Sequence, residues 1–222
     1  MRGRALTLRI SIALALSGAV FAVSACGGSD AERQDVDEPS GEFPVEVLEA
    51  DFPTRQRLAE RSDLTLGVEN IGEEQIPDLA VTICLDSCDS DGPFSLRSEQ
   101  TGLSSPNRPV WILEQDYPKL LEPGISPKEL EDEPTAGAEA AQTNTFSFGA
   151  IAPGDEITAV WRVTPVQAGT YTVNYEVAAG LTGKAKAITA DGSSAEGSFV
   201  VTIEDKPPQA TVEPDGSIKI EK

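Results

Sequence analysis

Three aspartates close together, Asp86, Asp89 and Asp91, are the residues whose type and spacing come nearest to those of a metal-binding loop. Carboxylate oxygens are the ligands that calcium takes in such loops, and Gly92 supplies a turn residue beside them. The calcium-loop spacing nevertheless fails. A loop that begins at Ser87 lacks a carboxylate at its first position, and one that begins at Asp86 places Asp91 where glycine is required. We expect a polar turn here, with a looser cation site as the alternative.

The sequence contains no histidine, which excludes several classes of catalytic and metal-binding site. Ser-His-Asp and Cys-His catalysis need an imidazole, as do the commonest metal sites, and the sequence contains none. The segment 180–184 ends in glycine and lysine but lacks the remaining residues of a phosphate-binding loop. Carboxylate pairs occur throughout so acidic a chain, so no single pair indicates a hydrolytic site. We expect a protein that is not an enzyme and that carries no cofactor.

The N-terminal segment predicts where the protein resides. Arginines at positions 2, 4 and 9 precede an apolar run over residues 10–22, which is too short to span a membrane. The run leads into Val23-Ser24-Ala25-Cys26, and together these features resemble the signal peptides of bacterial lipoprotein precursors. The resemblance implies cleavage before Cys26, a palmitate-type diacylglycerol on its sulfur, and anchorage in the lipid bilayer at the extracytoplasmic face of the cell membrane. An ordinary cleaved signal peptide is the alternative.

Two cysteines, Cys84 and Cys88, remain once Cys26 is assigned to the lipid. An even remainder in an oxidising compartment predicts a disulfide bond. The spacing differs from the redox C-x-x-C pattern, and the sequence has no further cysteine pair or histidine to complete a zinc site. We expect the pair to close a tight loop and to contribute about 2 kcal/mol to stability, with unpaired thiols as the alternative.

The charge balance limits the class of partner. The formal net charge is −20, from 37 acidic and 17 basic residues. Such a surface repels phosphate backbones, so we expect no nucleic-acid partner, and it offers no basic patch to anionic lipids. Membrane attachment is therefore expected through Cys26.

Short runs of alternating apolar residues, separated by turn residues, predict an all-β fold of the sandwich type. Leu64, Leu66 and Val68 share one face of the clearest early strand, and residues 169–177 alternate along their whole length. Lys184 and Lys186 indicate an edge strand that is protected by charge. The strands we expect cover residues 45–50, 64–70, 79–84, 145–148, 157–163, 169–177, 185–190 and 198–203.

The domain organisation follows from these runs. Residues 1–25 are the expected signal peptide, residues 26–42 a lipidated flexible tether, and residues 43–206 one β-sandwich. Prolines interrupt the sandwich over residues 89–143, where we expect a long, mostly irregular insertion. Residues 207–222 are expected to form a C-terminal tail or one edge strand.

Three aromatic residues and one helix signal give separate predictions. Trp111 is the ring best placed for contact with a partner, because it lies in the irregular insertion, although a plug over the sandwich is the interpretation we favour. Trp161 and Tyr171 are in phase with apolar neighbours, which predicts core packing, and Tyr171 also fits a tyrosine corner. Ser126 is placed to begin a short helix.

Each half of the predicted sandwich contains short motifs of its own. Ala152-Pro153-Gly154-Asp155 precedes the tryptophan strand, and Ala168-Gly169-Thr170-Tyr171 opens the next one. Earlier in the chain, residues 63–72 end in a V-x-N-x-G turn and are followed by Pro77-Asp78-Leu79. These motifs resemble the close and the opening of CARDB-type domains and related bacterial Ig-like modules. The resemblance implies an Ig-like β-sandwich and, through the family's name, a role of the cell-adhesion type.

Together these features favour a lipid-anchored, non-catalytic interaction or adhesion module on the bacterial cell envelope. We expect it to bind an unknown protein partner through its insertion or by strand addition at an open sheet edge. The alternative is an accessory domain that binds a ligand or a divalent cation through the loop from Asp86 to Asp91 or through Trp111.

Overall fold

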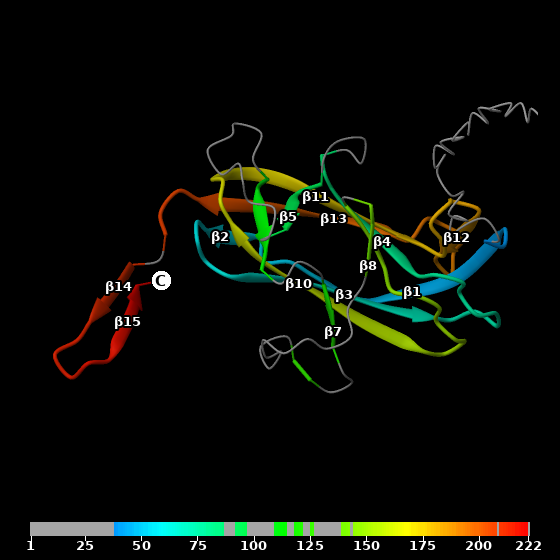
Figure 1. Ribbon diagram of the computed structural model, residues 1–222, viewed down its shortest axis with the longest axis horizontal. Helices are drawn as coiled ribbons and strands as arrows, with labels where there is room; N and C mark the ends of the chain where they lie inside the picture. The colour runs from blue at the N-terminus through cyan, green and yellow to red at the C-terminus, as the bar shows by residue number, and fades with distance from the viewer. Residues whose placement is uncertain are drawn as a thin grey trace, which may run out of the picture. The chain divides into compact units, whose positions relative to one another are not determined.

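The computed structural model describes residues 38–86, 92–96, 109–114, 118–121, 125–126, 139–142, 144–207 and 209–221. Every regular element in these ranges is a β-strand, and Figure 1 shows the strands along the chain. The all-β class expected from the alternating sequence pattern is confirmed.

The first sheet is mixed and contains both long and short strands. Its order is β12-β1-β3-β10-β6-β5, and β7 also pairs with β10. β1 pairs antiparallel with β3 but parallel with β12, and β5 pairs parallel with β6. The strands are β1 (Gly41–Asp51), β3 (Ser62–Asn70), β5 (Phe94–Leu96), β6 (Trp111–Leu113), β7 (Lys119–Leu120), β10 (Glu156–Pro165) and β12 (Ala185–Ile188).

The second sheet has the order β2-β13-β11-β4-β9-β8 and is also mixed, because β2 pairs parallel with β13. Its strands are β2 (Arg55–Arg57), β4 (Ala80–Leu85), β8 (Glu139–Gln142), β9 (Thr145–Ser147), β11 (Gly169–Ala178) and β13 (Glu196–Glu204). All eight strands expected from the sequence are present within a few residues of their predicted bounds.

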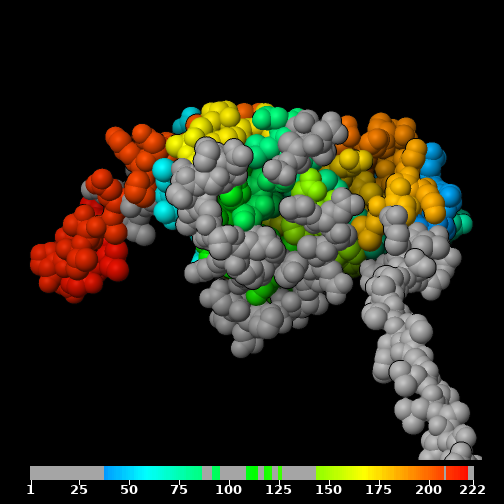
Figure 2. All heavy atoms as spheres, turned by 45° about the horizontal axis from the view of Figure 1, so that its top comes forward, coloured from blue at the N-terminus to red at the C-terminus, as the bar shows by residue number. Residues whose placement is uncertain are grey.

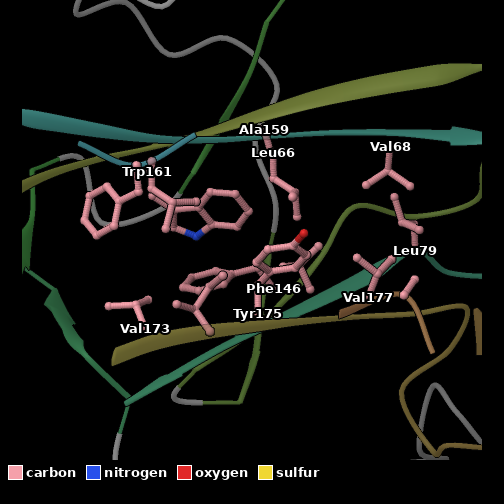
Figure 3. Packing of buried hydrophobic residues seen from close by; sticks show 14 of the residues in the cluster. Leu66, Val68, Leu79, Phe146, Ala159, Trp161, Val173, Tyr175 and Val177 are labelled. Carbon is pink, nitrogen blue, oxygen red and sulfur yellow. The ribbon is translucent and has the colours of Figure 1, made fainter. Parts of the chain in front are cut away.

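The two sheets form a sandwich around one shared core. Leu64, Leu66 and Val68 on β3 are fully buried, as their alternation predicts, and belong to the same cluster as residues of the second sheet. Figure 3 shows side chains of the two layers pointing toward one another. Among them the rings of Phe146 on β9 and Trp161 on β10 lie 5.8 Å apart in an edge-to-face arrangement. Trp161 is therefore a core residue, as predicted.

The described parts of the segment 89–143 add four short strands, β5 to β8, to the two sheets. β6 lies between β10 and β5, so it is an interior strand of the first sheet rather than a loop that covers it. Ser126 is exposed and has no regular structure, and the residues expected to continue its helix lie outside the described ranges.

An ion pair between a buried arginine and a half-buried aspartate joins two interior strands of the first sheet. Arg162 on β10 lies opposite Asp63 on β3 and donates from Nε to Oδ1 (2.9 Å) and from a terminal nitrogen to Oδ2 (3.2 Å). The arginine side chain is 7% exposed. The two parallel hydrogen bonds fix the register of β3 against β10, because a shift of one residue would separate the charges.

The C-terminal segment forms a hairpin rather than one edge strand or a tail. β14 (Gln209–Val212) pairs antiparallel with β15 (Ile218–Glu221), and Gly216 in the connecting turn has φ +83°. Val212 and Ile218 lie directly opposite each other and are both 69% exposed.

Candidate functional site

Trp111 is not a surface contact. Its side chain is fully buried on β6, where its ring packs against Phe52, Phe94 and Tyr171 at centroid distances of 5.5, 6.2 and 5.7 Å. The indole Nε1 donates a 2.7 Å hydrogen bond to Oε1 of the buried Gln56. Contact of this ring with a partner does not fit its burial. The interpretation that we favoured, a plug over the sandwich, places the ring against the core correctly, but the segment that carries it is a strand of the sheet.

Tyr171 has the contact that a tyrosine corner requires. Its hydroxyl donates to the carbonyl oxygen of Ala168 at 3.1 Å, just before β11 begins. The ring also packs against Trp111 from the other sheet. Tyr171 is thus a packing residue, in agreement with the sequence prediction.

The predicted cation loop and disulfide lie mostly outside the described residues. Asp86 is exposed and has φ 52°, but Asp89 and Asp91 are not described. Cys84 is fully buried on β4, while Cys88 is not described, so their bond remains a prediction. Within the described residues, no group of three or more His, Cys, Asp or Glu side chains is placed to hold a metal ion.

The predicted lipid anchor, Cys26, also lies outside the described ranges. The part of the chain that the structure describes has no helix with the length and apolar character needed to cross a membrane. The predictions of lipidation and of membrane location therefore stay predictions.

The open edge of β1 is the feature of the described surface best suited to binding. β12 pairs with β1 from Gly41 to Pro44, but within the described residues no strand continues this pairing along residues 45–51. The opposite side of residues 45–51 is paired with β3. Half of β1 therefore presents one row of backbone donors and acceptors that a further strand can use.

A β-bulge lies in the middle of this open edge. The register of β1 against β3 shifts between Val47 and Glu49, so Leu48 is the extra residue. Its side chain is 47% exposed. Bulges are one of the devices that limit uncontrolled pairing of an exposed edge, and they also redirect side chains beside binding sites.

A hollow of about 540 Å³ lies beside the start of the open edge, lined by Val45, Glu46, Val47, Ile71, Thr189, Ala190, Asp191, Ser193 and Ser194. Its lining comes from both flanks of β1, because Ile71 follows β3 and residues 189–194 follow β12. Ile71 is 39% exposed. Figure 2 shows the blue atoms of the first strand adjoining the orange atoms of the segment around β12.

The turn from Thr189 to Ser194 forms one side of the hollow. Asp191 accepts hydrogen bonds from the hydroxyl of Thr189 and from the backbone N–H of Ser193 (3.1 Å). Ile188 and Ser194 pair in an isolated antiparallel β-bridge. The Thr189 hydroxyl and the Ser193 groups hold the pKa of Asp191 below its usual range. Gly192 has φ +83°, a conformation that glycine adopts without strain. The turn is thus tied together by its own residues.

Glu38 fixes the place where β12 joins β1. Its carboxylate accepts hydrogen bonds from the backbone N–H groups of Leu181 (2.7 Å), Thr182 (2.9 Å) and Ala185 (3.1 Å). Burial raises the pKa of Glu38, but the hydrogen bonds from Thr182, Ala185 and Leu181 outweigh it and leave the pKa below its usual value. A Cβ on Gly180 would lie 2.2 Å from a carboxylate oxygen of Glu38, so any side chain there would displace this carboxylate from its present hydrogen bonds.

The sequence pattern did not predict this site. It predicted β1, and it predicted that the segment with Lys184 and Lys186 forms an edge strand, which the structure confirms as β12. It did not show that β12 covers only the first part of β1, because that depends on pairing between residues more than a hundred positions apart.

Comparison with known proteins gives structural likeness only. No protein-family model and no curated protein matches the sequence. The chain is similar to the CARDB domain of a Pyrococcus furiosus protein solved in complex with di-metal ions (13% identity, 75% of this chain, 99% of that chain, TM-score 0.40). It is also similar to a cohesin module of a Clostridium perfringens family 33 glycoside hydrolase (10% identity, 74% of this chain, 98% of that chain, TM-score 0.36).

A third similar structure is the part of Escherichia coli alpha-2-macroglobulin from domain MG7 to the C-terminus (15% identity, 79% of this chain, 21% of that chain, TM-score 0.33). These likenesses assign neither a family nor a function, and the β-sandwich follows from the chain's own sheets and shared core.

Proposed function

We propose that the chain is a bacterial lipoprotein, anchored by a diacylated Cys26 at the extracytoplasmic face of the cell membrane, whose β-sandwich is a non-catalytic module that binds a protein partner. The lipobox resemblance supports the anchor. The observation that carries the binding role is the open half of β1 with its adjoining hollow. An extended segment of another protein can gain main-chain hydrogen bonds there and place a side chain in the hollow.

The anchor is tested by mass spectrometry of the mature protein from a bacterial host. We expect an N-terminal peptide that begins at Cys26 and carries the added mass of a diacylglycerol. Cys26→Ser should abolish both the added mass and the cleavage before position 26. A peptide that begins at another residue, or one that begins at Cys26 without the added mass, contradicts lipidation.

The binding role is tested by site-specific photo-crosslinking in intact cells. The crosslinker replaces Leu48 at the bulge, Ile125 in the insertion, or Lys206 after β13, all exposed positions. We expect one protein to be captured reproducibly from position 48 and not from position 206. Specific capture from position 125 alone keeps the interaction function and moves it to the insertion. Identical capture profiles from all three positions contradict a partner-binding site.

A further inference from the structure

The open half of β1 separates acidic and apolar side chains onto opposite faces. In the register against β3, Val47 and Ala50 lie opposite the core residues Val68 and Leu66. The positions that alternate with them point to the other face of the sheet, which places Glu46, Glu49 and Asp51 on the outer face. The remaining positions, apart from the bulge residue, are Val45, Val47 and Ala50, which belong to the core-facing side. Residues 41–51 contain no basic residue.

The acidic character continues across the sheet. Glu46 on β1 lies directly opposite Glu69 on β3, and Glu69 lies directly opposite Glu156 on β10. The three glutamates thus form one row across three strands, which we call the glutamate row. Like charges directly opposite each other repel, and no ion pair joins these carboxylates to a described residue. A cation placed next to Glu46 on an added strand would extend the row with an attractive pair.

Backbone geometry sets the form of what can bind there. A strand that pairs with residues 45–51 continues the line of β12, and its side chains alternate between the two faces of the sheet. One set would lie beside Glu46, Glu49 and Asp51, and the other beside the apolar side, where Ala50 is exposed. The hollow at the start of the edge adds apolar lining from Val45, Val47 and Ile71.

We infer that the open edge of β1 binds an extended peptide segment in which basic and apolar residues alternate, with the basic side chains on the face of the glutamate row and the apolar side chains toward the core. This inference rests on the proposed interaction function and names the class of partner. It needs both the backbone edge of residues 45–51, which no described strand pairs, and the separation of charge from apolar surface along these residues.

The test uses the full-length chain, expressed in a bacterial host and purified in detergent, with a fluorescein-labelled peptide of alternating lysine and valine, about eight residues long. One control peptide has the same composition with all lysines before all valines. A second has the alternating sequence with N-methyl groups on every residue, which removes the N–H donors from both pairing edges. We expect fluorescence anisotropy to show that the alternating peptide binds about tenfold or more tightly than either control.

Two matched variants locate the site. Glu46→Lys with Glu49→Lys reverses two charges on the open edge, and Glu73→Lys with Glu74→Lys makes the same change on an exposed turn. We expect the first pair to weaken lysine-valine binding about tenfold and to gain binding of an alternating glutamate-valine peptide, a gain that an unfolded variant cannot show. The second pair should leave both affinities near those of the parent chain.

Four outcomes overturn the inference. Equal affinity for the alternating and block peptides would show that the peptide is attracted by charge alone. An equal loss of lysine-valine binding in the two variant pairs would show the same. Unchanged binding of the N-methylated peptide excludes strand pairing. Sedimentation showing that the chain dimerises, with loss of the dimer in the Glu46→Lys, Glu49→Lys variant, makes a second copy the occupant. None of these outcomes decides the proposed function, which the in-cell crosslinking experiment tests separately.

Discussion

The indole of Trp111 donates a hydrogen bond to Gln56, with 2.7 Å between Nε1 and Oε1, and both side chains are buried. Gln56 in turn donates from Nε2 to the carbonyl of Pro53 at 3.0 Å. A side chain on the edge strand β2 thus satisfies a ring on the interior strand β6 of the other sheet. This bond ties the segment that follows β5 into the core.

Gln56→Leu should lower the free energy of unfolding by about 1–3 kcal/mol, because the buried N–H of Trp111 then loses its acceptor. Chemical denaturation measures the loss. In a double-mutant cycle, Trp111→Phe should lower the free energy of unfolding less in the Gln56→Leu background than in the parent chain. In that background the substitution removes an N–H that has already lost its acceptor. Trp161 provides the control, because its Nε1 has no hydrogen-bond partner among the described residues, so Trp161→Phe and Gln56→Leu should be additive. Additivity in both cycles would contradict the role of the hydrogen bond.

The ion pair between Asp63 and Arg162 should matter far more than a surface pair. Asp63→Ala leaves the buried Arg162 charge without this partner, and we expect a loss of about 3 kcal/mol. Glu204→Ala removes an exposed pair with Arg57 and should cost about 0–1 kcal/mol. Thermal unfolding of both variants gives the comparison, and equal losses would show that this pair stabilises the fold no more than an exposed pair does.

Relief of the glutamate row should stabilise the protein. Glu69 lies between Glu46 and Glu156, so Glu69→Gln removes two repulsive contacts and should raise stability by about 0.2–1 kcal/mol. The gain should shrink as sodium chloride rises, because salt screens exposed charges. Glu73→Gln, on the exposed turn after β3, is the matched control with little expected effect. A gain that does not depend on salt would contradict an electrostatic cause.

Acid should weaken the attachment of Glu38 to the turn before β12. Because hydrogen bonds hold the pKa of the folded carboxyl below its usual value, the carboxylate stabilises the fold above about pH 4.3, and this contribution is lost as pH falls through the folded-state pKa. Glu38→Gln should cost about 1 kcal/mol at neutral pH, since the partly exposed carboxylate is screened by water.

The corresponding measurement is the unfolding free energy of parent and variant from pH 7 to pH 3. The two curves should converge at the acid end, since protonation removes the negative charge of Glu38 from the parent chain, as the glutamine substitution does in the variant. Curves that remain parallel over the whole range would show that the charge of Glu38 contributes nothing to folding.

The sequence predicted what depends on local pattern. Alternation of Leu64, Leu66 and Val68 identified β3 because one face of the strand is buried. It missed β2, whose residues Arg55–Arg57 show no apolar alternation and pair with β13 far along the chain.

The site was harder to predict than the fold, because its parts meet only through long-range register. Glu46, Glu69 and Glu156 are far apart in the sequence and become neighbours only through the pairing of β1, β3 and β10. The place of Trp111 was predicted only in part. We expected the ring to cover the sandwich, but the prolines around it indicate an irregular segment, whereas the segment forms the three-residue strand β6. A pattern read along one chain cannot show that Gln56 accepts a hydrogen bond from that ring.

The place of β12 beside β1 also sets an order of events in folding. The contacts that hold Glu38 and the first residues of β1 join positions 143 to 147 apart in the chain. Pairing over such a distance closes a very large loop and is slow. Among the described strands, β1 leaves the ribosome first but acquires its neighbour β12 among the last. Any chain interrupted before residue 185 leaves β1 without that neighbour.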